Sequence, residues 1–253
     1  MENLKTILSS FEPISLNEME TVALMDRTDT KFVFGLNRLP AILANIRALY
    51  RVLTINNIQA SKYQTLYFDT PDFNMYQEHQ RRKSARYKIR HRIYVDSQTH
   101  FFEVKFKNNK GRTIKNRVKR SGLESTIRGK AEDLLTTYSR YSPDMLLPKL
   151  WSNCSRITLV NRYSKERLTL DIDLQFKNDS IEKNLSNVVI AEVKQEKRTP
   201  SPFIQLMKEY KIREGSISKY CFGVAFLYDQ VKKNNFKMNM LTINKINDNE
   251  NRN

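Results

Sequence analysis

The sequence predicts an α+β fold in which an N-terminal helix precedes an antiparallel β-sheet with helical insertions, closed into a barrel. Two observations predict this fold. Segments of alternating charged and apolar residues recur along the chain, and a two-residue period is typical of strands with one polar and one apolar face. Helical patterns are short and lie between these segments, and the 253 residues show neither a repeat of fixed period nor a low-complexity linker.

The first predicted elements are mostly helices. Apolar spacing in residues 1–20 indicates a helical lead-in, and "NRLPAILANIRALYRVL" (37–53) indicates a helix with Pro40 in its first turn, where a missing N–H costs little. "YQTLYFDT" (63–70) has the aromatic and threonine content of a strand, and the turn-like "DTPDFN" ends it. "FNMYQEHQRR" (73–82) then predicts a short helix.

Strands dominate the rest of the chain. The sequence predicts three strands in "ARYKIRHRIYV", "THFFEVKFK" and "TIKNRVKR", with "NNKG" as a hairpin loop between the last two. A helical insertion near 123–147 precedes three more strands in "RITLVNRYS", "RLTLDIDLQF" and "NVVIAEVKQE". A helix around 203–211 and the apolar run "YCFGVAFLY" complete a domain placed at residues 21–228, and the Asn- and Lys-rich residues 229–253 predict a flexible tail.

The charged faces of five predicted strands carry the main functional signal. Alternation puts the following side chains on one face of their strand: Arg86, Lys88, Arg90 and Arg92; Glu103, Lys105 and Lys107; Lys115, Arg117 and Lys119; Arg167, Asp171 and Asp173; Glu192 and Lys194. A solvated outer face would explain one such strand. Five such strands favour an anionic ligand, because directly opposed like charges destabilise a sheet unless an anion lies between them.

If the sheet closes with these faces inward, the wall of the resulting tunnel is cationic with a few carboxylates. Arginine forks and lysine ammonium groups suit phosphate oxygens. The carboxylates would repel phosphate unless a divalent cation lay between them, so we expect them to hold Mg²⁺ or Mn²⁺ together with substrate phosphates.

Composition narrows the class of protein. The formal net charge of +17 points to a polyanionic partner, which leaves nucleic acid, nucleotide, polyphosphate and anionic lipid open. The sequence contains no GxxxxGK[ST] or GxGxxG phosphate motif and no HExxH zinc motif. Cys154 and Cys221 form no CxxC pair, which favours a reducing compartment, and no signal peptide or membrane-spanning apolar run is recognisable. We therefore expect a cytoplasmic protein.

An ordered series of segments resembles a known family. The segments are "DRTDTKFVF", "YFDTPDFNMYQEH", "KIRHRIY", "FFEVKFK" with "GRTIKNRV", "NRYSKERLTLDIDLQF", "AEVKQE" and "SKYCFG". Together they resemble the VTC domain, the polyphosphate polymerase domain of vacuolar transporter chaperone complexes, in the CYTH-like superfamily of triphosphate tunnel metalloenzymes. The wider superfamily often begins with an E-x-E-x-K strand, whereas this chain has "DRTDTKFVF" at that place.

The resemblance implies an eight-stranded tunnel that binds a nucleoside triphosphate and polyphosphate, with a divalent metal. It assigns catalytic roles to Arg90, Arg92, Lys105 and Lys219, and substrate binding to Lys31, Lys115, Arg162, Arg167 and Lys194. Glu192 matches the metal-binding glutamate of the family. Glu103, Asp171 and Asp173 remain open between metal binding and ion pairs with neighbouring Arg or Lys. Arg86 and Lys88, outside the closest match, are expected to guide the anion at the entrance.

The expected function is that of a polyphosphate polymerase, which moves the γ-phosphate of ATP onto a growing chain. In-line phosphoryl transfer relies on positioning and charge neutralisation, so a catalytic His or Ser is not required. Two alternatives stay open: an inorganic triphosphatase or nucleotide phosphohydrolase, and a binding module without turnover. Specific nucleic-acid binding is not expected, because no recognised motif accompanies the charge. A separate membrane protein is a candidate partner, which would place the protein at the inner face of a membrane.

Overall fold

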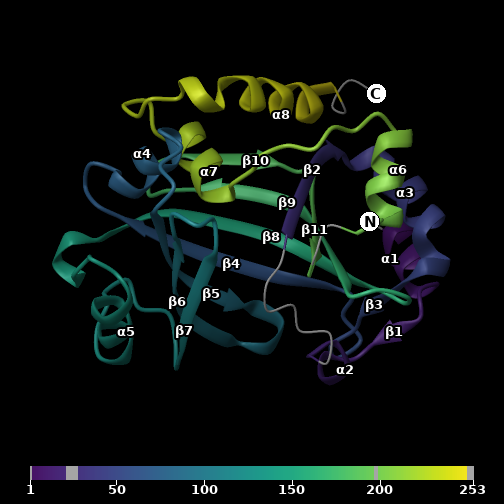
Figure 1. Ribbon diagram of the computed structural model, residues 1–253, viewed down its shortest axis with the longest axis horizontal. Helices are drawn as coiled ribbons and strands as arrows, with labels where there is room; N and C mark the ends of the chain where they lie inside the picture. Colours follow the sequence, from purple (N-terminus) through teal and green to yellow (C-terminus); the bar gives the residue numbers. More distant parts are fainter. Residues whose placement is uncertain (1, 21–27, 197–198, 250–253) are drawn as a thin grey trace.

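The computed structural model describes residues 2–20, 28–196 and 199–249, and the start predicted for the domain at residue 21 lies outside them. The strands are β1 (Pro13–Ile14), β2 (Thr28–Gly35), β3 (Tyr50–Leu53), β4 (Ala60–Asp69), β5 (Arg86–Tyr94), β6 (Thr99–Lys107), β7 (Thr113–Arg120), β8 (Leu147–Asn161), β9 (Glu166–Lys177), β10 (Glu182–Leu185) and β11 (Val188–Gln195). The helices are α1 (Glu2–Ser9), α2 (Leu16–Glu20), α3 (Leu39–Ile46), α4 (Asn74–Gln80), α5 (Lys130–Tyr138), α6 (Pro202–Glu209), α7 (Lys219–Leu227) and α8 (Lys237–Asn249) (Figure 1).

A single large sheet organises the molecule. Its main path is β2-β11-β9-β8-β4-β5-β6-β7, and every neighbouring pair on this path is antiparallel. β10 pairs with β9, and β3 pairs with β8 and, in parallel, with β1. Each predicted charged strand therefore lies in the same sheet.

The predicted closed barrel is wrong, because the sheet is open. Its path starts at β2 and ends at β7, and no pairing joins these edges in the described parts of the chain. The outer edge of β2 is instead occupied by residues 214–215: Phe32 forms a bridge with Glu214, and the Gly215 N–H donates to the Lys31 carbonyl at 2.9 Å. Alternation specifies which face of a strand is polar, but closure also depends on strand tilt and stagger.

The open sheet is nevertheless strongly curved. The Lys31 ammonium on β2 donates to the Ile217 carbonyl at 3.0 Å, and the Lys88 ammonium on β5 donates to the Ser218 hydroxyl at 2.9 Å. Four strands separate β2 from β5 in the sheet order, yet lysines from these two strands bind the successive residues Ile217 and Ser218. One face of the sheet is therefore concave, with these lysines on it.

Helices cover the apolar strand faces, as the alternation predicts. One core joins α3 and α6 to β8, β9 and β11, with α3 contributing the buried Leu39, Ile42, Leu43 and Ile46. A second core joins α4, α5 and α7 to the other half of the sheet. α7 is apolar on nearly all sides and is buried on all sides as well, as such helices require.

Several short helices lie where they were predicted. α4 falls within 73–82, α6 within the region around 203–211, and α5 within the insertion near 123–147. Residues 237–249, part of the predicted flexible tail, form α8, whose Ile243 is 3% exposed and which contacts β2 and β11. Among the helices of the described residues, none is both long and apolar enough to span a bilayer.

A cationic site on the concave face of the sheet

Ionic side chains from both ends of the sheet order meet on the concave face. Strand pairing sets Arg90 opposite Glu103, Lys105 between Lys88 and Lys115, Arg156 opposite Asp171, Glu192 opposite Lys31, and Lys194 between Arg167 and Asp29. We call this set, together with Arg92 and Lys219, the ionic face. Its cations outnumber its carboxylates, so the face carries net positive charge.

Glu103 holds one arginine of the ionic face. Its side chain is fully buried, and it accepts hydrogen bonds from Arg90 Nε at 2.6 Å and Lys115 Nζ at 3.3 Å. Burial by itself would raise the pKa of Glu103, but Arg90, Arg92 and Lys115 hold that pKa well below its usual range. Glu103 therefore stays ionised and fixes Arg90 in one orientation.

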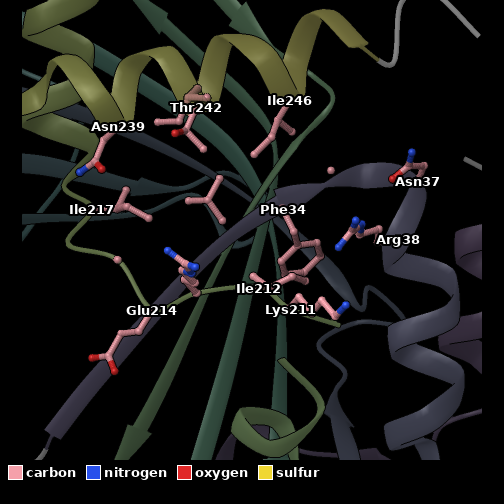
Figure 2. A pocket seen from close by; sticks show the side chains of 15 residues that line it. Phe34, Asn37, Arg38, Lys211, Ile212, Glu214, Ile217, Asn239, Thr242 and Ile246 are labelled. Carbon is pink, nitrogen blue, oxygen red and sulfur yellow. The ribbon is translucent and has the colours of Figure 1, made fainter. Parts of the chain in front are cut away.

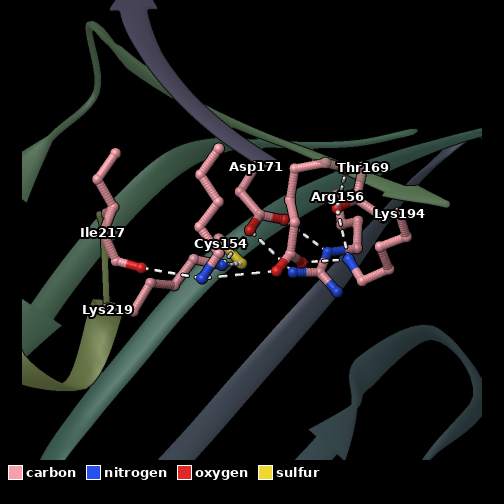
Figure 3. A network of polar contacts seen from close by, with 9 residues as sticks. Cys154, Arg156, Thr169, Asp171, Lys194, Ile217 and Lys219 are labelled. Atoms are coloured by element: carbon pink, nitrogen blue, oxygen red, sulfur yellow. Dashed lines mark hydrogen bonds and ion pairs between the residues drawn. The ribbon is translucent and has the colours of Figure 1, made fainter. Parts of the chain in front are cut away.

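Asp171 does the same for a second arginine (Figure 3). Arg156 makes a fork with it, with Nε to Oδ1 at 2.6 Å and a terminal nitrogen to Oδ2 at 2.8 Å. Lys219, the first residue of α7, also donates to Asp171 Oδ2 and lies 3.4 Å from Cys154 Sγ. Burial opposes ionisation of Asp171, yet Arg156 and Lys219 lower its pKa. Bidentate geometry gives the guanidinium a defined plane.

Glu192 links two lysines at the β2 side. Lys194 donates to Glu192 Oε2, and Lys31 Nζ lies 3.5 Å from Oε1. Burial would raise the pKa of Glu192, but Lys194 and Lys31 lower it well below its usual value. The Glu192 side chain is 20% exposed, against 5% for Asp171 and 0% for Glu103. Of these three carboxylates it is the one an added ion can reach.

Lys88 and Lys105 differ from these anchored cations. Burial, followed by the charges of Lys31 and Arg90 among others, lowers the pKa of Lys88 to about 8. Burial, with Lys88 and Arg90 next, lowers the pKa of Lys105 to about 7. In the described parts of the chain, no carboxylate lies within ion-pair distance of either ammonium. An anion beside them would restore their protons.

The carboxylates of the ionic face differ in whether they can hold a metal ion. Within the described residues, no three His, Cys, Asp or Glu side chains are grouped to hold a metal ion. Both oxygens of Glu103 and of Asp171 are occupied by cations, so these two serve as anchors for arginine. Magnesium commonly takes one or two carboxylates and completes its shell with water and substrate phosphates. The residues therefore fit a metal held by Glu192 and by bound phosphates.

Two candidate residues, Arg162 from the resemblance and Asp173 from the charged face of its strand, lie away from the ionic face. Arg162 follows β8 and pairs with Glu12 near the N-terminus. Asp173 is exposed and has a φ of +51° where the β8–β9 register shifts, so a bulge breaks the alternation that would have put it beside Asp171. The other assigned cations are on the face.

Arg156 was missed by sequence reasoning. The signal was present, because Arg156 and Thr158 alternate with Ile157 and Leu159 in "RITLV".

Two other cations lie inside the concave face. Lys88 was expected at the entrance, but its ammonium instead points from β5 to the Ser218 hydroxyl. Arg92 lies in the wall with its guanidinium 5.8 Å from the Tyr63 ring centre, and its buried Nε has no hydrogen-bond partner among the described residues.

A cavity with a volume of about 580 Å³ lies elsewhere, between the end of β2, residues 211–217 and α8. Figure 2 shows Phe34, Ile212 and Ile246 around it, with Arg38 and Lys211 at one side. Its charged lining residues, Arg38, Lys211, Arg213 and Glu214, are all exposed, so buried charge does not converge there as it does on the ionic face.

Comparison with known proteins identifies the family. The model of the VTC domain matches residues 26–228, which is most of the chain. The chain therefore belongs to the VTC domain family, and the resemblance drawn from its motifs is confirmed. No curated protein sequence matches the chain significantly.

Solved structures with a similar arrangement have low sequence identity to the chain. A candidate adenylate cyclase from Vibrio parahaemolyticus is 13% identical, with 79% of this chain and 99% of that chain covered and a TM-score of 0.48. One from Bacillus halodurans is 14% identical, with 81% and 100% covered and a TM-score of 0.49. A candidate adenylyl cyclase from Hippeastrum, described as having a dominant triphosphatase activity, is 12% identical, with 80% and 96% covered and a TM-score of 0.48.

Proposed function

We propose that the ionic face binds a nucleoside triphosphate and a phosphate chain, and that the protein transfers the γ-phosphoryl group of ATP to the end of the chain. The observation that carries the proposal is the excess of cations on one concave face, with two arginines fixed by buried carboxylates. Membership of the VTC domain family supports the same chemistry.

The fixed arginines suit the electrostatic demand of phosphoryl transfer. Charge spreads over the equatorial oxygens of the transferred group, and preorganised donors stabilise it without reorganisation at the moment of reaction. Arg90 and Arg156 are held by Glu103 and Asp171, so their orientation is set before substrate binds. A terminal phosphate is already ionised at neutral pH, so the acceptor needs no general base.

A divalent cation fits beside Glu192. Glu192 would hold Mg²⁺ or Mn²⁺ there, and the ion would supply positive charge that neutralises part of the phosphate charge. Lys31 and Lys194 flank the same carboxylate and would contact phosphate oxygens that the metal leaves free. Removing the Glu192 carboxylate should therefore weaken metal dependence more than it weakens binding of the phosphate chain.

Hydrolysis of an inorganic triphosphate is the second candidate, because the same fixed arginines would bind a triphosphate and stabilise the charge that develops when water is the acceptor. Which acceptor is used, water or phosphate, separates the two functions.

The test is to incubate the purified protein with ATP and Mn²⁺ and to resolve the products on a gel that separates phosphate chains. Growing chains that disappear in Arg90→Ala and weaken in Glu192→Gln would support the polymerase. Arg162→Ala is the matched control, because it removes an arginine that pairs with Glu12 away from the ionic face. Release of orthophosphate without chains would contradict the polymerase and favour hydrolysis.

A further inference from the structure

Asp69 is a buried carboxylate in the "YFDT" segment that the proposed chemistry does not use. It lies at the end of β4 and is 0% exposed. One oxygen accepts the backbone N–H groups of Thr70 at 2.8 Å and Met75 at 2.9 Å, and the other accepts that of Tyr76 at 2.9 Å. These bonds tie the beginning of α4 to the end of β4.

The Tyr220 hydroxyl is the remaining partner of Asp69. It donates to the oxygen that also accepts from Tyr76, and Tyr220 is 2% exposed. The Tyr220 ring packs 5.2 Å from that of Tyr67, which lies opposite Arg90 in the β4–β5 register. Asp69 therefore connects α4 to the first turn of α7, beside the ionic face.

Residues 217–220 form a bridge across the concave face that contacts β2, β5 and β9. The Ile217 carbonyl and the Ser218 hydroxyl accept from lysines on β2 and β5, as described above. Ser218 also caps α7, accepting the Cys221 N–H, and Lys219 pairs with Asp171 on β9. The place of this bridge depends on how α7 is held.

The apolar contacts of α7 set its depth but are not directional. A Cβ on Gly223 would lie 2.4 Å from Leu150, so the helix and the sheet are in close contact there. The Asp69–Tyr220 bond is directional, and it lies one residue from Lys219. A shift of about 1 Å can cost a charged group its productive geometry.

We propose that Asp69 and Tyr220 are positioning residues for Lys219: the bond between them fixes the first turn of α7 so that the Lys219 ammonium stands at Asp171, facing the phosphate. The inference rests on the proposed function insofar as Lys219 contacts phosphate. It assigns one shared role to the "YFDT" and "SKY" segments, although Asp69 and Tyr220 are 151 residues apart in the sequence.

The test is a double-mutant cycle with Tyr220→Phe, which removes one hydroxyl and keeps the ring, and Lys219→Ala. Affinity for inorganic tripolyphosphate is measured by calorimetry for the wild type, both single variants and the double variant. We expect Tyr220→Phe to weaken binding about five- to tenfold when Lys219 is present and less than about twofold when it is absent. An equal factor in both backgrounds, or a lowered melting temperature with unchanged affinity, would overturn the proposal.

Tyr228→Phe is the matched control, because that hydroxyl donates to the Lys149 carbonyl at 2.6 Å, remote from Lys219. It should leave tripolyphosphate affinity unchanged. Asp69→Asn is the second variant and should reproduce the coupling if Tyr220→Phe perturbs folding.

A readout without ligand separates this inference from the proposed function. The rate at which acetic anhydride modifies Lys219, followed by mass spectrometry, should rise severalfold in Tyr220→Phe, because the Lys219 side chain, 16% exposed beside Asp171, becomes more accessible to the reagent when it is displaced. If the wild type does not bind tripolyphosphate, the proposed function fails, and the acylation rates alone decide whether Lys219 is positioned. An unchanged rate would contradict the positioning role.

Discussion

Arg90 and Arg156 on the ionic face differ from Lys88 and Lys105 in how their charge is maintained. Arg90 and Arg156 each have a buried carboxylate partner that stays ionised, so their charge and direction are permanent. Lys88 and Lys105 are buried among other cations, and each has a lowered pKa. The first pair is organised before the ligand arrives, whereas the charge of the second pair depends on an anion being present.

Loss of an anchored arginine should have the largest effect. Arg156→Ala leaves Asp171 buried with one cation fewer, which should lower the free energy of unfolding by about 3 kcal/mol. Phosphoryl transfer should fall by about 100-fold or more, because a fixed donor to the developing charge is gone. Denaturant unfolding and a product assay measure the two effects. Unchanged turnover would remove Arg156 from the site.

Glu103→Gln should separate orientation from charge. The variant removes a negative charge from the ionic face, so electrostatics alone predicts equal or tighter binding of tripolyphosphate. Arg90 and Lys115 lose their anchor, so turnover should fall about tenfold. Steady-state kinetics measures the turnover, and calorimetry measures the affinity for tripolyphosphate. If turnover rose in parallel with affinity, fixed orientation of Arg90 would not matter.

The lysine region should make ligand binding depend on pH. Lys105 and Lys88, with pKa values of about 7 and about 8, lose protons as pH rises from 6 to 9, so tripolyphosphate affinity should fall over this range. Calorimetry in buffers of different ionisation enthalpy should show proton uptake on binding near pH 8. Lys105→Arg should flatten the profile, since arginine stays protonated. A flat wild-type profile would contradict the lowered pKa values.

The same lysines should give the ligand-free protein the opposite pH dependence. In the unfolded chain they keep their protons up to about pH 10.4, whereas in the folded protein they release them near 7 and 8. The unfolded state then binds more protons between about pH 7 and 9, so the free energy of unfolding should increase with pH. Thermal melts of the wild type and of Lys105→Met, which should show a weaker increase, test this sign.

The smallest effects are expected outside the ionic face. Arg162→Ala and Asp173→Asn should each change turnover by less than about twofold, because one residue pairs with Glu12 and the other is an exposed bulge residue. Exposed ion pairs contribute little to stability as well. A tenfold loss of activity in either variant would mean that the site extends beyond the face described here.

Strand alternation correctly predicted which side chains share a face, and hence most of the ionic face, because the two-residue period follows from backbone geometry. It could not predict the bulge at Asp173, which depends on one extra residue relative to β8. Barrel closure also could not be read from alternation, since the edge of β2 is occupied by residues 214–215 from a distant part of the chain.

The ion-pair partners of the charged side chains could not be predicted from the sequence either. Asp171 pairs with Arg156 and with Lys219 from a helix far along the chain, and only the fold brings them together. Arg156 itself could have been found from the pattern of its strand. The role of Asp69 could not, because its partner Tyr220 is 151 residues away.

The most direct test of the central claim is a crystal structure with a non-hydrolysable ATP analogue and Mn²⁺, with the metal located by its anomalous signal. The account predicts phosphate oxygens within hydrogen-bond distance of Arg90 and Arg156, and the metal beside Glu192. Phosphates bound in the cavity beneath α8, or only on exposed lysines outside the concave face, would contradict it.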